Sequence, residues 1–522
     1  MYACPTCGAG LIFDPKTQKL LCPSCRNQYD PENIEKMRLD KAKEIENETE
    51  LKDEYQAISY KCSHCGAELI TTDETITTFC SFCRTGSMLD RRIIKKKRPD
   101  FIIPFKITKE ECEEIYIKKI KKSIFAPKEM IEEQEVKKIR GIYMPYWIYT
   151  FEKHSNDVST GKKYSHRSGD YVYYDDYSLT TNVDAECYGM THDATSNFSD
   201  RLSESIAPYS IKESKEFSPA YFSGYYADNE DVKELTYLDE NEKIAKNELS
   251  KILGKEKEYH KYNARPNINM DEKNAKLALF PVYFLATKNK RNDRISYAVI
   301  NGQTGKIAAD IPIDFKKFAI FSIILTLIIF VLLNMFLSLS MPKLVIASIL
   351  FNIGSLSILI NQNKKIDKIE NQTDDRGVQS KKLEDKSNGT QNKSNTVLFP
   401  HFGLTVFLVF ILLFITLFVY VELKEYLFLV KYIWSILILI IYLIFIIKDY
   451  KRNKNYDKPI LGLLITLMVF IIEPASDLYY YIAAFISISL TIGSFYNIIQ
   501  KINILTTRKL PQLEKRGGDE NA

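Results

Sequence analysis

The residues best suited to chemistry in this sequence are cysteines arranged in pairs near the N-terminus. Eight of the ten cysteines form four Cys-x-x-Cys pairs, which are Cys4 and Cys7, Cys22 and Cys25, Cys62 and Cys65, and Cys80 and Cys83. Fourteen residues separate the two pairs of each set, and the second set repeats the first after 58 residues. A two-residue gap lets one tight turn present two thiolates, and four thiolates suit a tetrahedral zinc ion. We therefore predict two structural Zn²⁺ ions, with iron in a rubredoxin-like site as the alternative.

Each set of cysteines encloses a short hairpin pattern that is typical of a zinc ribbon. In the first set, residues 11–15 and 19–21 read as two strands joined by a turn, and residues 68–79 repeat the pattern. Gly8 and Gly66 each follow a cysteine pair, where a positive φ is often needed. No export signal precedes Cys4, which favours metal binding over disulfides. Four protein ligands leave no open coordination position, so we do not expect the metal to be catalytic.

Composition divides the 522 residues into a polar part, up to about residue 314, and an apolar part. The predicted fold class is multidomain, with two small β zinc ribbons, a cytoplasmic α+β domain and an all-α polytopic membrane domain. In order, we predict zinc ribbon 1 (1–29), a charged helical connector (30–59), zinc ribbon 2 (60–90), a basic linker (91–100), the α+β domain (101–314), a first transmembrane helix pair (315–361), a disordered cytoplasmic loop (362–400), transmembrane helices 3–6 (401–500) and a cytoplasmic tail (501–522).

The α+β domain shows no motif of a known catalytic site. We expect a helix over 107–122 capped by Thr108, a tyrosine-rich β region over 164–190, and a turn at 302–306. The turn sequence Gly-Gln-Thr-Gly-Lys lacks the four-residue gap of a P-loop, and an isoleucine stands where Ser or Thr would bind magnesium. No metalloprotease or nucleophile-elbow motif is present. We therefore predict that the protein is not an enzyme.

Six apolar segments predict the membrane domain: 318–340, 343–360, 402–421, 427–447, 459–474 and 477–498. With the N-terminus inside, the cytoplasmic segments 361–401, 448–458 and the tail after 499 hold eight, five and five Lys or Arg residues. The positive-inside rule then places both termini in the cytoplasm. The sequence thus predicts a multi-pass protein of the plasma membrane.

A basic run follows the second ribbon and could contact phosphate groups or anionic lipid. Its cationic residues are Arg91, Arg92, Lys95, Lys96, Lys97 and Arg98. The net charge of the chain is only +5, which does not by itself indicate nucleic acid. The connector before the second ribbon is rich in glutamate, whereas a DNA-binding face is normally more basic.

Several segments together resemble one family. They are the opening Cys-Pro-x-Cys-Gly ribbon, the second ribbon, Ile-Pro-Phe-Lys-Ile at 103–107, Gly-Ile-Tyr-Met-Pro-Tyr-Trp at 141–147, Tyr-Phe-Ser-Gly-Tyr at 221–225 and Asn-Gly-Gln-Thr-Gly-Lys at 301–306. This pattern, over roughly residues 1–340, resembles the bacterial TFIIB-type zinc-ribbon membrane proteins, which are often labelled primosomal or helicase-like. The resemblance implies partners of the SPFH (flotillin-like) and phage-shock-protein-A-like classes.

The predicted function is therefore a membrane-anchored zinc-ribbon adaptor that recruits protein partners to the cytoplasmic face of the membrane in envelope stress. Two alternatives stay open. One is a membrane-tethered, replication-associated nucleic-acid binder that acts through the ribbons and the basic run. The other is a transporter or sensor with a regulatory zinc-ribbon domain.

Overall fold

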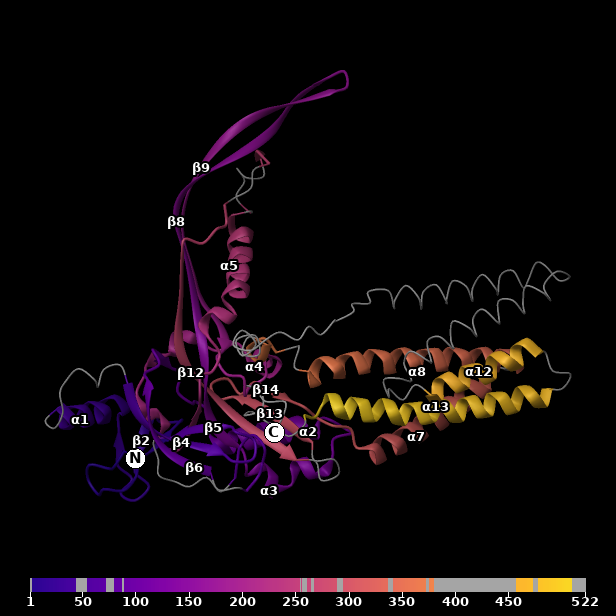
Figure 1. Ribbon diagram of the computed structural model, residues 1–522, viewed down its shortest axis with the longest axis horizontal. Helices are drawn as coiled ribbons and strands as arrows, with labels where there is room; N and C mark the ends of the chain where they lie inside the picture. Colours follow the sequence, from indigo (N-terminus) through magenta and orange to yellow (C-terminus); the bar gives the residue numbers. More distant parts are fainter. Residues whose placement is uncertain are drawn as a thin grey trace, which may run out of the picture. The chain divides into compact units, whose positions relative to one another are not determined.

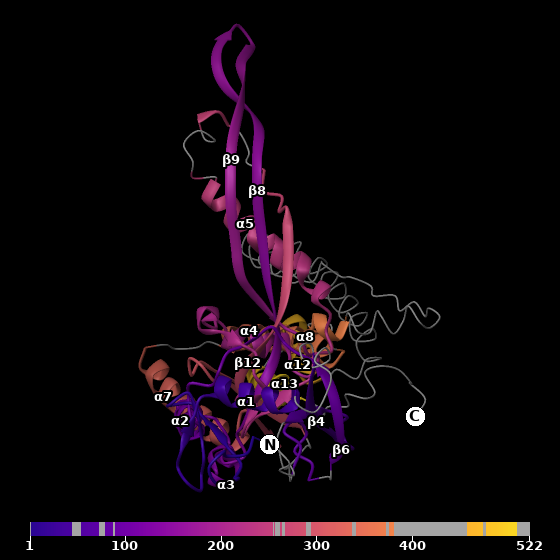
Figure 2. The ribbon, with the colours of Figure 1, turned by 90° about the vertical axis from the view of Figure 1, so that its left-hand side faces the viewer.

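The computed structural model describes residues 2–43, 54–71, 79–86, 89–253, 255, 261–263, 267–288, 294–336, 341–371, 375–379, 457–472 and 477–508. The chain forms two compact units. The first contains Met1–Ile311, Gln372–Asn388 and Thr507–Ala522, and the second contains Pro312–Asn371 and Gly389–Thr506. Figures 1 and 2 show their elements.

The first unit is built on β-sheets. Its strands are β1 (Ile12–Asp14), β2 (Lys19–Leu21), β3 (Gln28–Tyr29), β4 (Glu54–Cys62), β5 (Glu68–Thr71), β6 (Leu89–Lys97), β7 (Phe101–Ile102), β8 (Arg140–Ser168), β9 (Tyr171–Asp193), β10 (Lys215–Glu216), β11 (Tyr226–Asp228), β12 (Glu272–Lys288), β13 (Ile295–Asn301) and β14 (Ile307–Ala309). Strands β1–β3 form a small sheet. The other eleven form one sheet, in which β10-β7-β12-β8-β11-β5-β4-β6 is a continuous path, β9 pairs with β8, and β13 joins β12 to β14.

Short helices cover this framework. They are α1 (Pro31–Lys43), α2 (Lys109–Lys121), α3 (Glu133–Val136), α4 (Asp200–Ile206), α5 (Leu238–Leu253) and the 3₁₀ helices η1 (Lys128–Ile131), η2 (Ile211–Glu213), η3 (Pro219–Phe222) and η4 (Glu234–Thr236). Helix α2 confirms the predicted helix and its cap, because Thr108 and Glu111 form a reciprocal capping box. The α+β character of this unit is also as predicted.

The second cysteine set lies inside the large sheet. Strand β5 pairs with β11, which runs parallel to β8, so the hairpin of β4 and β5 extends the sheet of the α+β region. Strand β6, which contains most of the predicted basic linker, pairs with β4 along its whole length, from Leu89 to Lys97. Residues 91–97 are therefore part of a strand. Ile93 and Ile94 supply the β-branched content that favours it.

Strands β8 and β9 form an unusually long hairpin that projects from the sheet (Figures 1 and 2). The hairpin confirms the β prediction for 164–190. Its two-residue turn contains Gly169 at φ 61°, as tight hairpin turns require. Gly189, at φ 91°, is left out of the pairing between Tyr149 and Thr150 on β8, and so forms a β-bulge near the base. A third strand, β12, pairs with β8 only as far as Glu152.

The predicted phosphate-like motif is a turn between β13 and β14, as expected from the sequence. The carboxamide oxygen of Asn301 accepts hydrogen bonds from the backbone N–H groups of Gln303 and Thr304, at 2.9 and 3.0 Å. Gly305 has a φ of 75°. The motif leads into a strand, whereas a P-loop opens a helix, so it does not form a phosphate-binding loop.

The described part of the second unit is mainly helical. Its helices are α7 (Phe315–Phe336), α8 (Met341–Glu370), α12 (Asp457–Ile472) and α13 (Asp477–Leu505). Leu359, Ile460 and Ile498 bring α8, α12 and α13 together in one apolar cluster. Asn352 of α8 is fully buried there and donates a hydrogen bond of 2.7 Å to the hydroxyl of Ser487.

The prediction of a multi-pass membrane protein is contradicted, and with it the all-α polytopic domain. Within the described residues, only one helix, Tyr481–Leu505 of α13, is long and apolar enough to cross a membrane. Helix α12 has 16 residues, fewer than the roughly 20 that a span needs. An apolar run predicts a buried helix as readily as a spanning one, and α8 and α12 bury apolar side chains against α13.

Other membrane-half predictions fall partly or wholly beyond what the structure describes. The predicted segments 402–421 and 427–447 lie outside the described residues, as do most of the predicted loop 362–400 and the tail beyond residue 508. The start of that loop, up to Glu370, continues helix α8, and the start of the tail, up to Leu505, continues α13.

Candidate metal centres

The eight paired cysteines come together in two groups of four, as the spacing predicts. We call them cluster 1 (Cys4, Cys7, Cys22 and Cys25) and cluster 2 (Cys62, Cys65, Cys80 and Cys83). In each, the four sulfur atoms lie within 4.8 Å of one another. The measured Sγ–Sγ contacts between pairs are 3.6 and 3.5 Å in cluster 1, and 3.7 Å for both contacts in cluster 2.

The same backbone turn presents both cysteines of every pair. The N–H of the residue after the second cysteine donates to the carbonyl of the first, as from Gly8 to Cys4 at 2.9 Å and from Gly66 to Cys62 at 2.8 Å. This donor residue has a positive φ in all four turns. The two glycines satisfy this requirement, but Arg26 and Arg84 occupy the equivalent positions at φ 61° and 63°. Their positions directly after a Cys-x-x-Cys pair are the sequence signal that could have predicted a positive φ at these two arginines.

Both clusters have the dimensions of a tetrahedral thiolate site. Sulfur atoms at about 2.3 Å from a central ion define a tetrahedron with edges of about 3.8 Å. The observed contacts of 3.5–3.7 Å match this edge closely. A disulfide would bring two sulfur atoms to about 2.05 Å, and all ten cysteines are free. The two clusters can therefore bind two metal ions.

The clusters differ sharply in burial. All four cysteines of cluster 2 are at most 1% exposed and belong to the same apolar core as Phe82, Phe280 and Phe284. In cluster 1, Cys7 is exposed and Cys25 is half-buried. Cluster 2 thus lies in the interior of the α+β region, whereas cluster 1 lies at its surface.

Ribbon 1 is nevertheless packed against the same unit. Phe13 of β1 is 1% exposed and contacts the ring of Tyr221 edge-on, with centroids 5.2 Å apart. Its backbone N–H donates to the carbonyl of Ser223 at 2.9 Å. The Gln18 side chain donates to the carbonyl of Phe105 at 2.7 Å. These contacts hold the ribbon against the region around η3.

Local hydrogen bonds favour thiolates at specific positions. Burial raises the pKa of the Cys4 thiol, but hydrogen bonds from the Tyr29 hydroxyl and from the backbone N–H groups of Cys7 and Thr6 outweigh it and lower the pKa to about 6. In cluster 2, hydrogen bonds from Cys65, Cys80 and Cys83 lower the pKa of Cys62. Because thiolates are the form that binds metal, these groups are prepared for coordination.

Two cations beside cluster 2 were not anticipated from the sequence. Arg84 and Arg140 place their guanidinium groups over the ring of Phe79, at 5.6 and 3.8 Å from its centroid, and Phe79 directly precedes Cys80. Arg84 also forms a salt bridge of 2.7 Å with Glu135. Four thiolates around a divalent ion carry a net charge of about −2. The guanidinium groups therefore favour retention of the metal-bound form.

Five of the six predicted phosphate- or lipid-contacting residues lie on β6, and Arg98 directly follows it. Lys96 and Arg98 make contacts within the unit. Lys96 contacts Glu230 at 3.3 Å, and Arg98 contacts the Phe217 carbonyl at 3.1 Å and Glu35 at 3.9 Å. Arg92, Lys95 and Lys97 have exposed side chains, and Arg91 belongs to the same strand. Because the side chains of a strand alternate, the run is divided between two faces.

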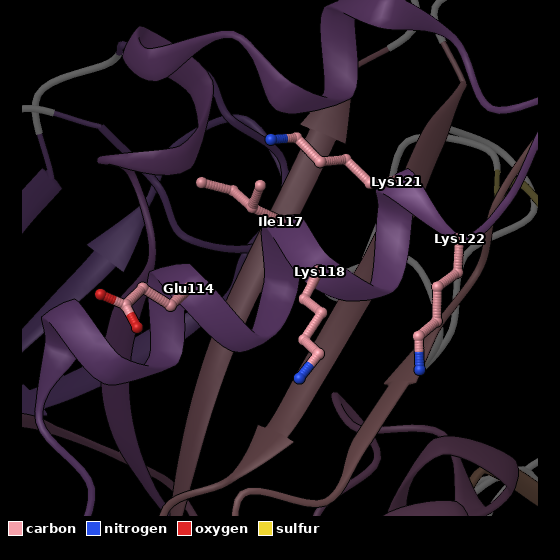
Figure 3. Close-up of a pocket in the computed structure, with 5 residues that line it drawn as sticks. All are labelled: Glu114, Ile117, Lys118, Lys121 and Lys122. Atoms are coloured by element: carbon pink, nitrogen blue, oxygen red, sulfur yellow. The ribbon is translucent and has the colours of Figure 1, made fainter.

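The α+β unit also carries a shallow surface pocket on one side of α2. It is lined by Glu114, Ile117, Lys118, Lys121 and Lys122. Figure 3 shows that these side chains come from a single helical segment and point in different directions. They do not form a convergent group of acid, base and nucleophile, which is what a catalytic site requires.

Comparison with known proteins identifies a relative. No family model and no solved structure matches the chain. A protein of Bacillus subtilis (strain 168), described as uncharacterized protein YdjG, is 30% identical over 328 residues. The match covers 61% of this chain and 92% of the relative. With identity at this level across nearly the whole of the relative, the chain belongs to the same family as YdjG.

Proposed function

We propose that this protein is a non-enzymatic zinc-ribbon scaffold that binds protein partners. The observation that carries the proposal is the outer part of the β8/β9 hairpin, residues 152–186, which we call the arm. Each cluster supplies four cysteines to its own ion, so a metal held there would have no open position for a substrate. Zinc is the ion proposed for both clusters, because it takes four thiolates in a closed structural site.

The arm extends far beyond the support of the sheet. It begins at Glu152, the last residue of β8 that pairs with β12, and continues on β8 to Ser168. At 3.3 Å per residue this is a length of about 55 Å. At its base, Val183 packs against Ala245 and Leu249 of α5. Tyr262 also contacts Tyr177 of the arm, with ring centroids 4.4 Å apart. An isolated two-stranded ribbon is only marginally stable in water, so a long ribbon without a third strand favours a role in which another protein covers it.

The end of the arm has the chemistry of a protein-binding surface. Tyr171 is 74% exposed, and Tyr173 and Tyr174 are about half exposed. Tyr173 stacks on His166 at 4.6 Å, and Tyr174 contacts Tyr164 edge-on at 6.3 Å, so the rings are held in place across the two strands. Pre-ordered tyrosines bury a large area at low entropic cost, and they are enriched at protein interfaces.

Among the described residues, no third strand pairs with the arm beyond Glu152, so its outer edges are a possible site for a partner strand. An exposed strand edge presents unpaired N–H and C=O groups that can extend the sheet into another chain. We propose SPFH (flotillin-like) and phage-shock-protein-A-like proteins as the partner classes, by the resemblance to TFIIB-type zinc-ribbon proteins.

Binding of nucleic acid is less well supported. Lys96 and Arg98 of the basic run face Glu230 and Glu35, which neutralise them. Affinity for nucleic acid rises with the number of cations free to contact phosphates.

The test is a crosslinked pull-down of the full-length, tagged protein from its native host, with captured proteins identified by mass spectrometry. The arm variant combines Tyr171→Ser, Tyr173→Ser and Tyr174→Ser. The matched control is Tyr188→Ser, which removes a 51% exposed tyrosine of β9 outside the arm. We expect flotillin-like or phage-shock-protein-A-like proteins with the wild type and the control, and their loss with the arm variant.

Two results would contradict the proposal. One is equal capture by the arm variant and the wild type. The other is recovery of nucleic acid alone, released steeply by added salt, which would favour the tethered nucleic-acid binder.

A further inference from the structure

A different set of metal-ligating side chains meets at the base of the β8/β9 hairpin. His192 and Asp193 are the last residues of β9, and Asp200 is the first residue of α4. One ligand atom from each lies within 4.8 Å of the others. Nδ1 of His192 is 3.1 Å from Oδ1 of Asp193. No cysteine takes part, so this cluster differs in chemistry from clusters 1 and 2.

Asp193 is the unusual member. Its side chain is fully buried, and neither carboxylate oxygen has a hydrogen-bond partner among the described residues. Nδ1 of His192 is likewise buried, and its contact of 3.1 Å with Asp193 is an ion pair only when the ring is protonated. An uncompensated buried carboxylate costs many kcal/mol, so buried charges are normally paired or coordinate a metal. The buried oxygens of Asp193 are therefore available to a cation.

The neighbouring groups hold the other two side chains in position. The His192 ring stacks on Tyr237, with centroids 3.4 Å apart and planes 10° from parallel. The Tyr237 hydroxyl donates to Oδ1 of Asp200 at 3.1 Å, and the backbone N–H of Arg376 donates to Oδ2 at 2.9 Å. Each oxygen of Asp200 keeps a lone pair for a further ligand. Such outer contacts are the usual means of orienting metal ligands.

We propose that His192, Asp193 and Asp200 bind a divalent transition-metal ion of the Mn²⁺, Fe²⁺ or Zn²⁺ class. One imidazole and two carboxylates are ligands that these ions accept, and the two carboxylates balance the charge of the ion. Ligand atoms at about 2.1 Å in octahedral geometry lie about 3.0 Å apart, close to the His192–Asp193 contact of 3.1 Å. The ion joins the end of β9 to the start of α4, directly below the arm.

An ion pair between a charged His192 and Asp193 is the competing explanation. Asp200 and Glu204, whose Oε1 lies 3.9 Å from Nε2 of His192, are the other acidic groups near that ring. An ion pair would satisfy Asp193 without any metal, and the two explanations differ in whether the folded protein binds added metal.

The experiment is a titration of full-length protein, purified with its thiolate sites loaded with zinc, with Mn²⁺ alone. Free Mn²⁺ is followed by electron paramagnetic resonance. Mn²⁺ is chosen because thiolate sites select zinc, whereas carboxylate and imidazole ligands accept manganese. We expect one Mn²⁺ per chain in the wild type. Because loss of an outer-shell partner already weakens binding by about 10–100-fold, Asp193→Asn should weaken it by at least about 100-fold.

The matched control is Asp184→Asn. Asp184 lies on the same strand and contacts Nδ1 of His154 at 2.7 Å, but it is 85% exposed, so its removal should leave Mn²⁺ binding unchanged. If Asp193→Asn does not fold, Tyr237→Phe removes only the hydroxyl bound to Asp200 and should weaken binding by about 10–100-fold. The proposal is overturned if the wild type binds no Mn²⁺, or if the variants at Asp193 and Tyr237 bind it as tightly as the wild type.

Discussion

Removal of one thiolate should have very different consequences in the two clusters. Cys65→Ser and Cys7→Ser are matched substitutions, because each changes the second cysteine of the first pair and replaces sulfur by oxygen with little change in shape. Cys65 is 1% exposed within the aromatic core of the α+β unit, whereas Cys7 is exposed to solvent. We expect Cys65→Ser to unfold the unit and Cys7→Ser to loosen only ribbon 1.

The magnitude follows from the role of each metal in folding. A structural zinc ion contributes an apparent 10–16 kcal/mol, about as much as or more than the 5–15 kcal/mol by which whole domains are stable. Loss of the metal in cluster 2 would also leave hydroxyl and thiol groups buried beside Phe82 and Phe284. The sum exceeds the stability of the unit. Loss of the metal in cluster 1 loosens ribbon 1, and loss of the packing of its buried Phe13 alone costs about 3–5 kcal/mol.

The assay combines zinc release, measured with a chromogenic chelator, and thermal unfolding followed by circular dichroism. We expect one zinc ion per chain and a retained cooperative transition for Cys7→Ser. For Cys65→Ser we expect no cooperative transition from the α+β unit. Cys112→Ser is the control, because Cys112 is fully buried but lies outside both clusters. Equal melting temperatures for Cys65→Ser and the wild type would refute the reasoning, as would loss of the transition in Cys7→Ser.

Two further predictions test the packing and the buried charge of the α+β unit. A Cβ at Gly302 would lie 2.5 Å from the ring of Phe105 and 2.9 Å from Cβ of Pro281, so Gly302→Ala should lower the free energy of unfolding in urea by about 1–3 kcal/mol; Gly354→Ala meets no atom within 4 Å and should not lower it. Burial raises the pKa of Asp228 to about 7, above its value in an unfolded chain, so its contribution to stability is fully present below about pH 4 and is lost as the pH rises through 7. Asp228→Asn should remove up to about 4 kcal/mol of this pH dependence. The assignment would be contradicted if the free energy of unfolding in urea changed equally between pH 4 and 8 in the variant and the wild type.

The sequence alone determined the features that depend on short-range spacing. The Cys-x-x-Cys pairs predicted both groups of four sulfurs, because a two-residue gap constrains the local turn whatever the rest of the chain does. Alternation predicted the tyrosine-rich hairpin, and the capping residues around Thr108 predicted the start of α2. The turn at 302–306 was predicted because its sequence lacks the four-residue gap of a phosphate-binding P-loop.

Tertiary structure decided what depends on pairing between distant segments. The second ribbon joins the main sheet through β11, where Ala227 pairs with Ile70 of β5 and with Tyr143 of β8, both far away in the sequence. Cluster 2 is buried in the core of that sheet. A separate pairing, of β6 with β4, makes a strand of residues 91–97, which had been predicted as a linker. The multi-pass prediction was wrong because, among the described residues, only Tyr481–Leu505 forms a helix long and apolar enough to cross a membrane. The sequence pattern did not define where each helix begins and ends. Asp193 and Asp200 became neighbours of a stacked His192 only when the end of β9, the start of α4 and Tyr237 were folded together, since no local pattern specifies contacts of that range.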